Sequence, residues 1–160
     1  MKLCNPNYDD SKDGEFERNC LNCVIALEMR YRNYDVEAKG WVDTPFDSSF
    51  TKLFKVFDSL VRDGSINDSY NKTINNKIDY LSRLYDNARL FFTVRYKHNW
   101  HALMLVIDNH EAHFYDPQKG VKLPVDFYNQ QEIIRFEYAR VDNLKIKSRE
   151  ARKYIKERGK

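Results

Sequence analysis

The fold of this chain is organised around the stretch Asn19-Cys20-Leu21-Asn22-Cys23-Val24-Ile25-Ala26-Leu27-Glu28-Met29-Arg30. Residues at helical spacing form one face of this segment and its continuation. They are Cys20, Cys23, Val24, Leu27 and Tyr31. We therefore predict a helix over residues 19–33 that begins at or beside a cysteine and turns both cysteines toward the rest of the domain.

The position of Cys20 at the start of this helix has a chemical consequence. A thiol attacks only as the thiolate, and the positive end of the helix dipole stabilises that anion. Cys23 lies one turn further in, where the field is weaker. Asn19 is a candidate to cap the helix or to donate to an oxyanion. Cys20 is therefore the predicted nucleophile, with Cys23 as the reserve nucleophile.

Downstream of this segment, the periodicity predicts two more helices and then several strands. One amphipathic helix is expected through residues 50–61, ended by Gly64, and another through residues 74–85. Strands are expected over 89–96, 101–107, 112–116 and 132–141, because these segments are rich in β-branched, aromatic and aliphatic residues. Helices followed by an antiparallel sheet indicate an α+β fold.

The length of 160 residues predicts a single domain. Residues 1–18 are polar and are expected to form a loop or arm. Residues 146–160 are basic and are expected to form an exposed terminal helix or tail.

A histidine and an aspartate occupy corresponding places on the two central strands. His101 begins one strand, and Asp116 ends the next. If the loop between the strands is centred on residues 109 and 110, position i faces position 219 − i, so Asp116 lies opposite Leu103. Diagonal neighbours on a sheet face are about 7–8 Å apart. This register therefore predicts that Asp116 lies beside His101.

Together, Cys20, His101 and Asp116 form a candidate catalytic group. An imidazole can accept the proton of a thiol and later return it to a leaving group. A third polar group holds the imidazole in one orientation and tautomer. Trp100 is a candidate to shield this group from water or to belong to the core. Gln118 is a candidate to bind substrate or to cap the strand end.

Other interpretations of the two cysteines are weaker. A redox Cys-x-x-C needs a βαβ context that the pattern does not predict. A zinc site needs two more ligands, and the chain has no second Cys-x-x-C. Two small cysteines packed on a helix face are common. We predict no metal and no cofactor.

Composition narrows the class of partner. The net charge is only +3, and the basic residues are spread along the chain, so dedicated nucleic-acid binding is not indicated. No transmembrane run or secretory signal is recognisable, and membrane association is not expected. Three cysteines are an odd number, which argues against a disulfide framework and favours a reducing compartment.

These motifs give the chain a resemblance that spans nearly its whole length. The matching segments are Asn5-Pro6-Asn7-Tyr8, Asn19 through Ala38, His101-Ala102, Asp116-Pro117-Gln118 and Arg140-Val141-Asp142. The chain resembles the papain-fold toxin domains of bacterial polymorphic toxins, which are often described as toxin glutamine deamidases and also occur with phage or mobile-element head-morphogenesis proteins. Asn33 stands where these domains usually have glycine, but asparagine tolerates the left-handed conformation of a helix C-terminus.

The resemblance implies a papain-like fold with Cys20 as nucleophile, His101 as base and Asp116 as the orienting residue. It also implies an effector domain of a larger secreted or injected protein, which acts on a protein substrate in the cytoplasm of a target cell. A cognate immunity protein is a partner that only the resemblance suggests. Glutamine deamidation is the favoured reaction. Proteolysis, transglutamination and non-catalytic binding of a partner by a papain-like module remain open alternatives.

Overall fold

Helices and antiparallel strands make up the computed structural model of the chain, which describes residues 3–41, 49–60, 64–66 and 71–159. The helices are α1 (Cys20–Tyr31), α2 (Ser49–Val56), α3 (Asn71–Leu84) and α4 (Ser148–Ala151), with a 3-10 turn η2 (Phe127–Gln130). The strands are β1 (Val36–Ala38), β2 (Gly64–Ile66), β3 (Asn87–Arg95), β4 (Trp100–Asp108), β5 (Glu111–Asp116), β6 (Val121–Leu123), β7 (Arg135–Arg140) and β8 (Ile155–Glu157). The predicted α+β class is confirmed.

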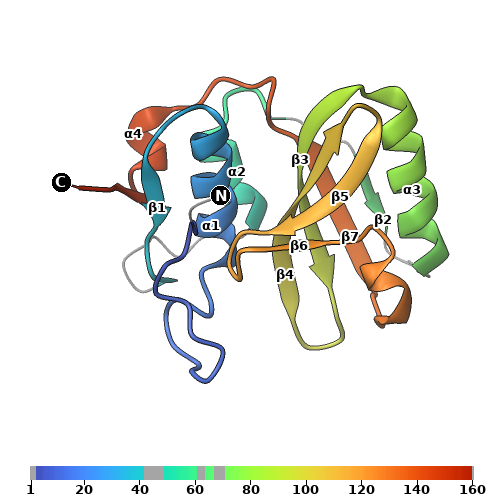
Figure 1. Cartoon of the computed structure of the whole chain (residues 1–160), viewed down its shortest axis with the longest axis horizontal. Coiled ribbons are helices and arrows are strands. Elements are labelled where there is room, and N and C mark those ends of the chain that lie inside the picture. The colour runs from blue at the N-terminus through green and yellow to red at the C-terminus, as the bar shows by residue number, and fades with distance from the viewer. Residues whose placement is uncertain (1–2, 42–48, 61–63, 67–70, 160) are drawn as a thin grey trace.

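A six-stranded sheet in the order β2-β7-β3-β4-β5-β6 forms the centre of the fold, and every neighbouring pair is antiparallel. α1 and α2 lie on one side of this sheet, and α3 lies on the other (Figure 1). Among the described residues, no helix has the length and apolar character needed to cross a bilayer.

Alternation along the strands builds a separate core on each side of the sheet. Leu90 and Phe92 belong to the core under α3, whereas Phe91 between them belongs to the core under α1. Phe92 stacks on Phe136 and Tyr138 at ring distances of 5.7 and 5.5 Å. Each side of the sheet therefore carries its own buried core.

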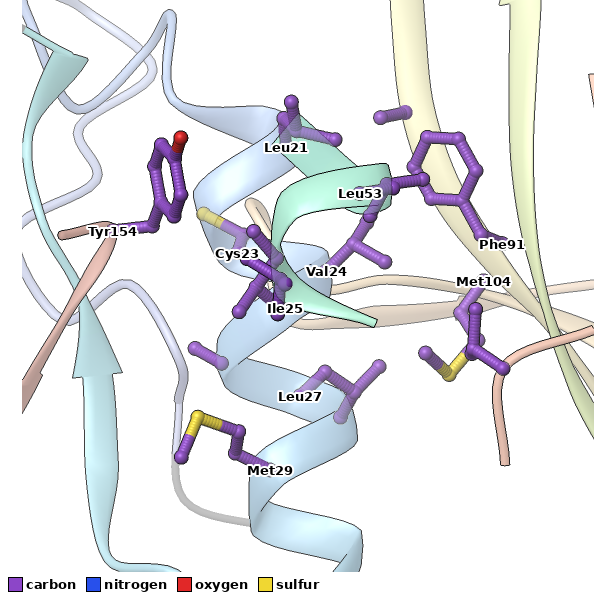
Figure 2. Close-up of a cluster of buried hydrophobic side chains, with 14 of the residues drawn as sticks. Leu21, Cys23, Val24, Ile25, Leu27, Met29, Leu53, Phe91, Met104 and Tyr154 are labelled. Atoms are coloured by element: carbon purple, nitrogen blue, oxygen red, sulfur yellow. The ribbon is translucent and has the colours of Figure 1, made fainter. Parts of the chain in front are cut away.

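Burial of α1 extends beyond the predicted face. Every residue from Cys20 to Met29 is buried, because a second sheet of β1 and β8 covers the side of the helix that faces away from the large sheet. Figure 2 shows side chains leaving α1 in both directions, with Leu27 toward Met104 on the large sheet and Cys23 toward Tyr154. The uninterrupted apolar run Val24-Ile25-Ala26-Leu27 fits this surrounded position.

A buried acid fastens α1 to the sheet. Glu28 is fully buried, and its carboxylate accepts two hydrogen bonds from Arg89 on β3, at 2.6 and 2.9 Å. Arg32 donates a third at 2.8 Å and reaches the backbone oxygens of Leu144 and Val141 with its other nitrogens. A charge in the interior requires this degree of pairing. The network fixes how α1 is rotated against β3.

The end of α1 follows the prediction for Asn33. This residue has a φ of 68°, in the left-handed region, and its backbone N–H bonds to the oxygen of Arg30. The next N–H, that of Tyr34, returns to the oxygen of Met29. This paired closure ends the helix and directs the chain into β1.

The C-terminal segment corrects the expectation of an exposed helix or tail over residues 146–160. α4 is a single turn, and β8 pairs antiparallel with β1. Tyr154 is fully buried, and Ile155 is nearly so. Five basic residues of this segment are exposed, namely Lys147, Arg149, Arg152, Lys153 and Lys156. Its apolar residues Ala151, Tyr154 and Ile155 belong to the core around α1.

The second helix ends earlier than predicted. α2 stops at Val56, and Phe57 instead forms an isolated bridge with Ile146. Gly64, the predicted terminator, begins strand β2. The Phe57 N–H still bonds to the oxygen of Leu53, but the next N–H, that of Asp58, bonds to the oxygen of Lys145 and so ends the helical pattern.

Candidate active site

The first element of the site is the start of α1, which places Cys20 at the wall of a cleft of about 1130 Å³. Asn19 precedes the helix but makes no side-chain capping bond, so that part of the prediction is wrong. Its side-chain amide instead forms hydrogen bonds with Asn5 and with the backbone oxygen of Lys39. The Asn19 side chain therefore does not cap the N–H groups at the start of α1.

The β4–β5 hairpin supplies the other two residues, in the predicted register. Asn109 and His110 form its two-residue turn with φ values of 49° and 63°, and Met104 pairs with Tyr115, as the relation 219 − i requires. His101 Nε2 lies 2.8 Å from Asp116 Oδ2. The expected contact between the histidine and the aspartate is present.

Asp116 is held as a carboxylate. It is buried at 3% exposure, and its Oδ1 accepts backbone N–H bonds from Gln118 at 3.0 Å and Lys119 at 3.2 Å. Burial acts to raise the pKa of this carboxyl, but the hydrogen bonds from His101 and the two N–H groups outweigh burial and lower it. The group is therefore an acceptor that fixes the imidazole ring.

His101 interacts with both partners. Burial opposes its charged form, but the hydrogen bonds and negative charges of Asp116 and Cys20 prevail and raise its pKa to about 10. Because Nε2 faces Asp116, Nδ1 is the ring nitrogen left for the thiol. The raised pKa favours an imidazolium at His101, next to the thiol of Cys20.

The other two cysteines lack this environment. Cys23 is completely buried, and its Sγ lies 3.3 Å from Asn19 Oδ1. Burial, with a smaller contribution from Cys20, raises the pKa of Cys23 well above its ordinary value. Burial also raises the pKa of Cys4, to about 11. Cys20 is the cysteine that lines the cleft. The reserve nucleophile Cys23 lies in the hydrophobic core around α1.

A buried amide network surrounds the start of α1. The Asn19 side chain donates to Asn5 Oδ1 at 3.2 Å and to the Lys39 oxygen at 2.9 Å, and its own Oδ1 accepts from Asn5 and Gln118. Both Asn19 N–H groups are thus engaged with other parts of the chain. Gln118 acts here as a tie between the end of β5 and α1. The position of Asn5 in this network was not predicted, because no local pattern reports a partner fourteen residues away.

Aromatic side chains form the rims of the cleft. Trp100 is 45% exposed, so it does not belong to the core, and it lines the cleft beside His101. Trp41 is 41% exposed and lines the same cleft, a role that sequence periodicity did not indicate. The remaining lining comes from the arm, α1, α2, Gln118 and the strand ends: Asp13, Glu17, Arg18, Asn19, Leu21, Asn22, Lys52, Thr93, Arg95, Tyr96, His98, Asn99, Gln118, Arg135 and Glu137.

The described residues offer few candidate ligands for a metal ion. No group of three or more His, Cys, Asp or Glu side chains there is arranged to hold an ion. Cys20 faces His101, while Cys23 faces Asn19, so the two thiols have different partners. The absence of a metal stays a prediction, to be tested by elemental analysis.

No family model, curated protein or solved structure matches the chain. Its function is therefore to be inferred from the residues of the cleft and from their chemistry.

Proposed function

We propose that this protein is a papain-like thiol hydrolase in which Cys20, His101 and Asp116 act on a protein substrate, with deamidation of glutamine as the reaction. The observation that carries the proposal is the chain of contacts from Cys20 through His101 to Asp116 at the wall of an open cleft. A helix that begins with the cysteine, and a sheet that carries the histidine and the aspartate, flank this cleft. That division supports the papain-like assignment.

The first half of the reaction forms a thioester. The Cys20 thiolate attacks the carbonyl carbon of the substrate carboxamide, and the negative charge moves to the carbonyl oxygen. The backbone N–H at the start of α1 is placed to stabilise that oxyanion. The His101 imidazolium then gives its proton to the amide nitrogen, the C–N bond breaks and ammonia leaves.

The second half restores the enzyme. The neutral His101 takes a proton from water, whose oxygen attacks the thioester carbon. The C–S bond breaks, the thiolate returns and the side chain leaves as glutamate. Asp116 keeps its charge throughout and stabilises the imidazolium in each half. The product acid gives its proton to the released ammonia, so the sum is carboxamide plus water to carboxylate plus ammonium.

The choice of glutamine comes from the resemblance to polymorphic-toxin domains. The same thioester follows attack on a peptide bond, in which case the leaving group is a peptide amine. Capture of the thioester by an amine gives transglutamination. Exposed Trp41 and Trp100 on the rims suit a polypeptide occupant in each case.

Mass spectrometry of the proteome of cells that produce the chain separates these outcomes. Deamidation adds about one dalton to a target, proteolysis releases fragments and transglutamination adds an amine. We expect the first, and expect it to be lost with Cys20→Ala or His101→Ala, since removing a nucleophile or base costs several orders of magnitude in rate. Asp116→Ala should reduce the rate by a smaller factor, because this residue orients the imidazole and does not react. If all the variants and the native chain leave the proteome unchanged while folded, the domain is a binding module.

We further propose that the chain is an effector domain acting in the cytoplasm of a target cell, with an immunity protein that covers the cleft. Growth arrest on cytoplasmic expression is the expected result, and Cys20→Ala should relieve it. Growth arrest that persists in Cys20→Ala would mean that the toxicity does not come from the thiol.

A further inference from the structure

The floor of the cleft is a continuation of the sheet face that packs under α1. Three successive cross-strand rows on β4, β3 and β7 share this face, as their pairing shows. They are Met104–Phe91–Ala139, Ala102–Thr93–Glu137 and Trp100–Arg95–Arg135. The first row is buried in the core, and the side chains of the last row line the cleft. The face thus changes from apolar to charged where it leaves the cover of α1.

The last row brings two arginines together. Arg95 and Arg135 are directly paired across β3 and β7, which places their Cβ atoms about 4.5–5.5 Å apart. Like charges directly opposite each other destabilise a sheet pair. Glu137 forms an ion pair with Arg135. Arg95 is exposed, and no carboxylate of the described residues forms an ion pair with it.

Trp100 flanks Arg95 on the other side of the row. It pairs with Arg95 across β3 and β4, and nearly half of its surface is exposed. Tryptophan and arginine are the residues most enriched among those that dominate binding energy at protein interfaces. The row therefore presents a cation between an indole and a second, ion-paired arginine at the mouth of the cleft.

We propose that the row Trp100–Arg95–Arg135 is a substrate subsite for the carboxylate of an acidic residue that flanks the target glutamine. This inference rests on the proposed function and names the substrate class for it. A carboxylate on Arg95 offsets the repulsion between the two arginines and can bond the guanidinium in two places. Trp100 immediately precedes His101 in the chain. Since an extended segment advances about 3.3 Å per residue, the acidic residue lies within a few positions of the glutamine.

Binding to a protein that cannot react tests the subsite. Short glutamine peptides with one Glu at successive positions are titrated calorimetrically into Cys20→Ala, beside matched peptides with Gln or Lys there. We expect one Glu position to bind about threefold to tenfold more tightly than Gln, and the preference to shrink as salt is raised. Arg95→Gln should remove the preference. Arg83→Gln, which changes the same charge on the exposed face of α3, should keep it.

Charge reversal guards against a variant that merely disturbs the cleft. In Cys20→Ala with Arg95→Glu, the Lys peptide should become the tighter ligand, while thermal unfolding shows that the fold is kept. Equal binding of Glu and Gln peptides at every position would overturn the subsite. So would a preference that survives Arg95→Gln, or tighter binding of inorganic phosphate than of the acidic peptide.

The same peptides separate this inference from the reaction. Incubated with the native chain, they report deamidation by release of ammonia. If none is deamidated but the Glu preference depends on Arg95, the subsite stands and the reaction is wrong. If deamidation occurs with no dependence on the flanking charge, the reaction stands and the subsite is wrong.

Discussion

One helical turn separates two thiols that the fold treats differently. Cys20 lies at the cleft beside His101, whereas Cys23 is sealed inside the protein with its thiol directed at Asn19. The difference comes from depth and not from residue type. A nucleophile needs a charged partner and access for substrate. Cys20 is only 7% exposed, but it lines the cleft and contacts His101, whereas Cys4 and Cys23 do not line the cleft.

We predict that iodoacetamide modifies Cys20 first near neutral pH, by about tenfold or more over Cys4 and Cys23, because burial raises the pKa of both other thiols. Peptide mapping by mass spectrometry measures the order. His101→Asn should slow the modification of Cys20 and leave the other two unchanged. Modification of Cys23 ahead of Cys20 in the folded protein would mean that Cys23, and not Cys20, is the activated thiol.

We predict that the His101 ring titrates near pH 10 and not near its ordinary value of 6.5. Burial lowers this pKa, but Asp116 and Cys20 raise it by more. NMR of the ring protons against pH measures it, and Asp116→Asn should move the titration downward. Because the folded value lies above the ordinary one, the charge of His101 contributes stability fully below pH 6.5 and loses that contribution as the pH rises toward 10. A ring that titrates near 6.5 in the native protein would contradict the raised pKa of His101.

At the scale of the element, the rotation of α1 depends on the ion network of Glu28. We predict that Glu28→Ala lowers the free energy of unfolding by about 3–5 kcal/mol, because Arg89 and Arg32 then lose their carboxylate in a partly buried position. Urea denaturation measures the change. Asp79→Ala, which removes an exposed pair with Arg83 on α3, is the control and should have little effect. Equal effects of the two substitutions would show that the network does not fasten α1.

The elements show what the sequence could predict. α3 and the central strands are long enough for their apolar residues to repeat at helical or strand spacing, so the sequence predicted where these elements lie. The contact of His101 with Asp116 follows from the register of one short hairpin, which is local information. β1, β6 and β8 have three residues each, too few to display a period, and their pairing depends on distant segments. For the same reason, the buried Asn5 and the exposed Trp41 could not be placed before the structure was known.

At the scale of the whole molecule, the C-terminal segment packs against the N-terminal part of the fold. β8 returns from the C-terminal segment to pair with β1, and Tyr154 inserts behind α1 (Figure 1, Figure 2). The helix that carries Cys20 is therefore held from both sides, by the large sheet and by the last residues of the chain. The geometry of the cleft is a property of the complete fold.

We predict that Tyr154→Ala destabilises the protein by about 3–5 kcal/mol, the usual cost of emptying a fully buried aromatic position. Thermal and urea unfolding measure it. Tyr80→Ala removes the same side chain from an exposed site on α3 and should change the free energy of unfolding only slightly. If the two variants were equally stable, Tyr154 would contribute no more to the free energy of unfolding than a residue of the exposed tail that the composition predicted.

The two tryptophans give the molecule an optical property. The chain contains only Trp41 and Trp100, and both line the cleft. Light absorbed at the red edge of the indole band, where the eleven tyrosines contribute little, is therefore emitted from the walls of the cleft alone. A ligand that enters between them should shift that emission to the blue without any label. Loss of the core under α3, by contrast, should change the emission only as far as it opens the cleft.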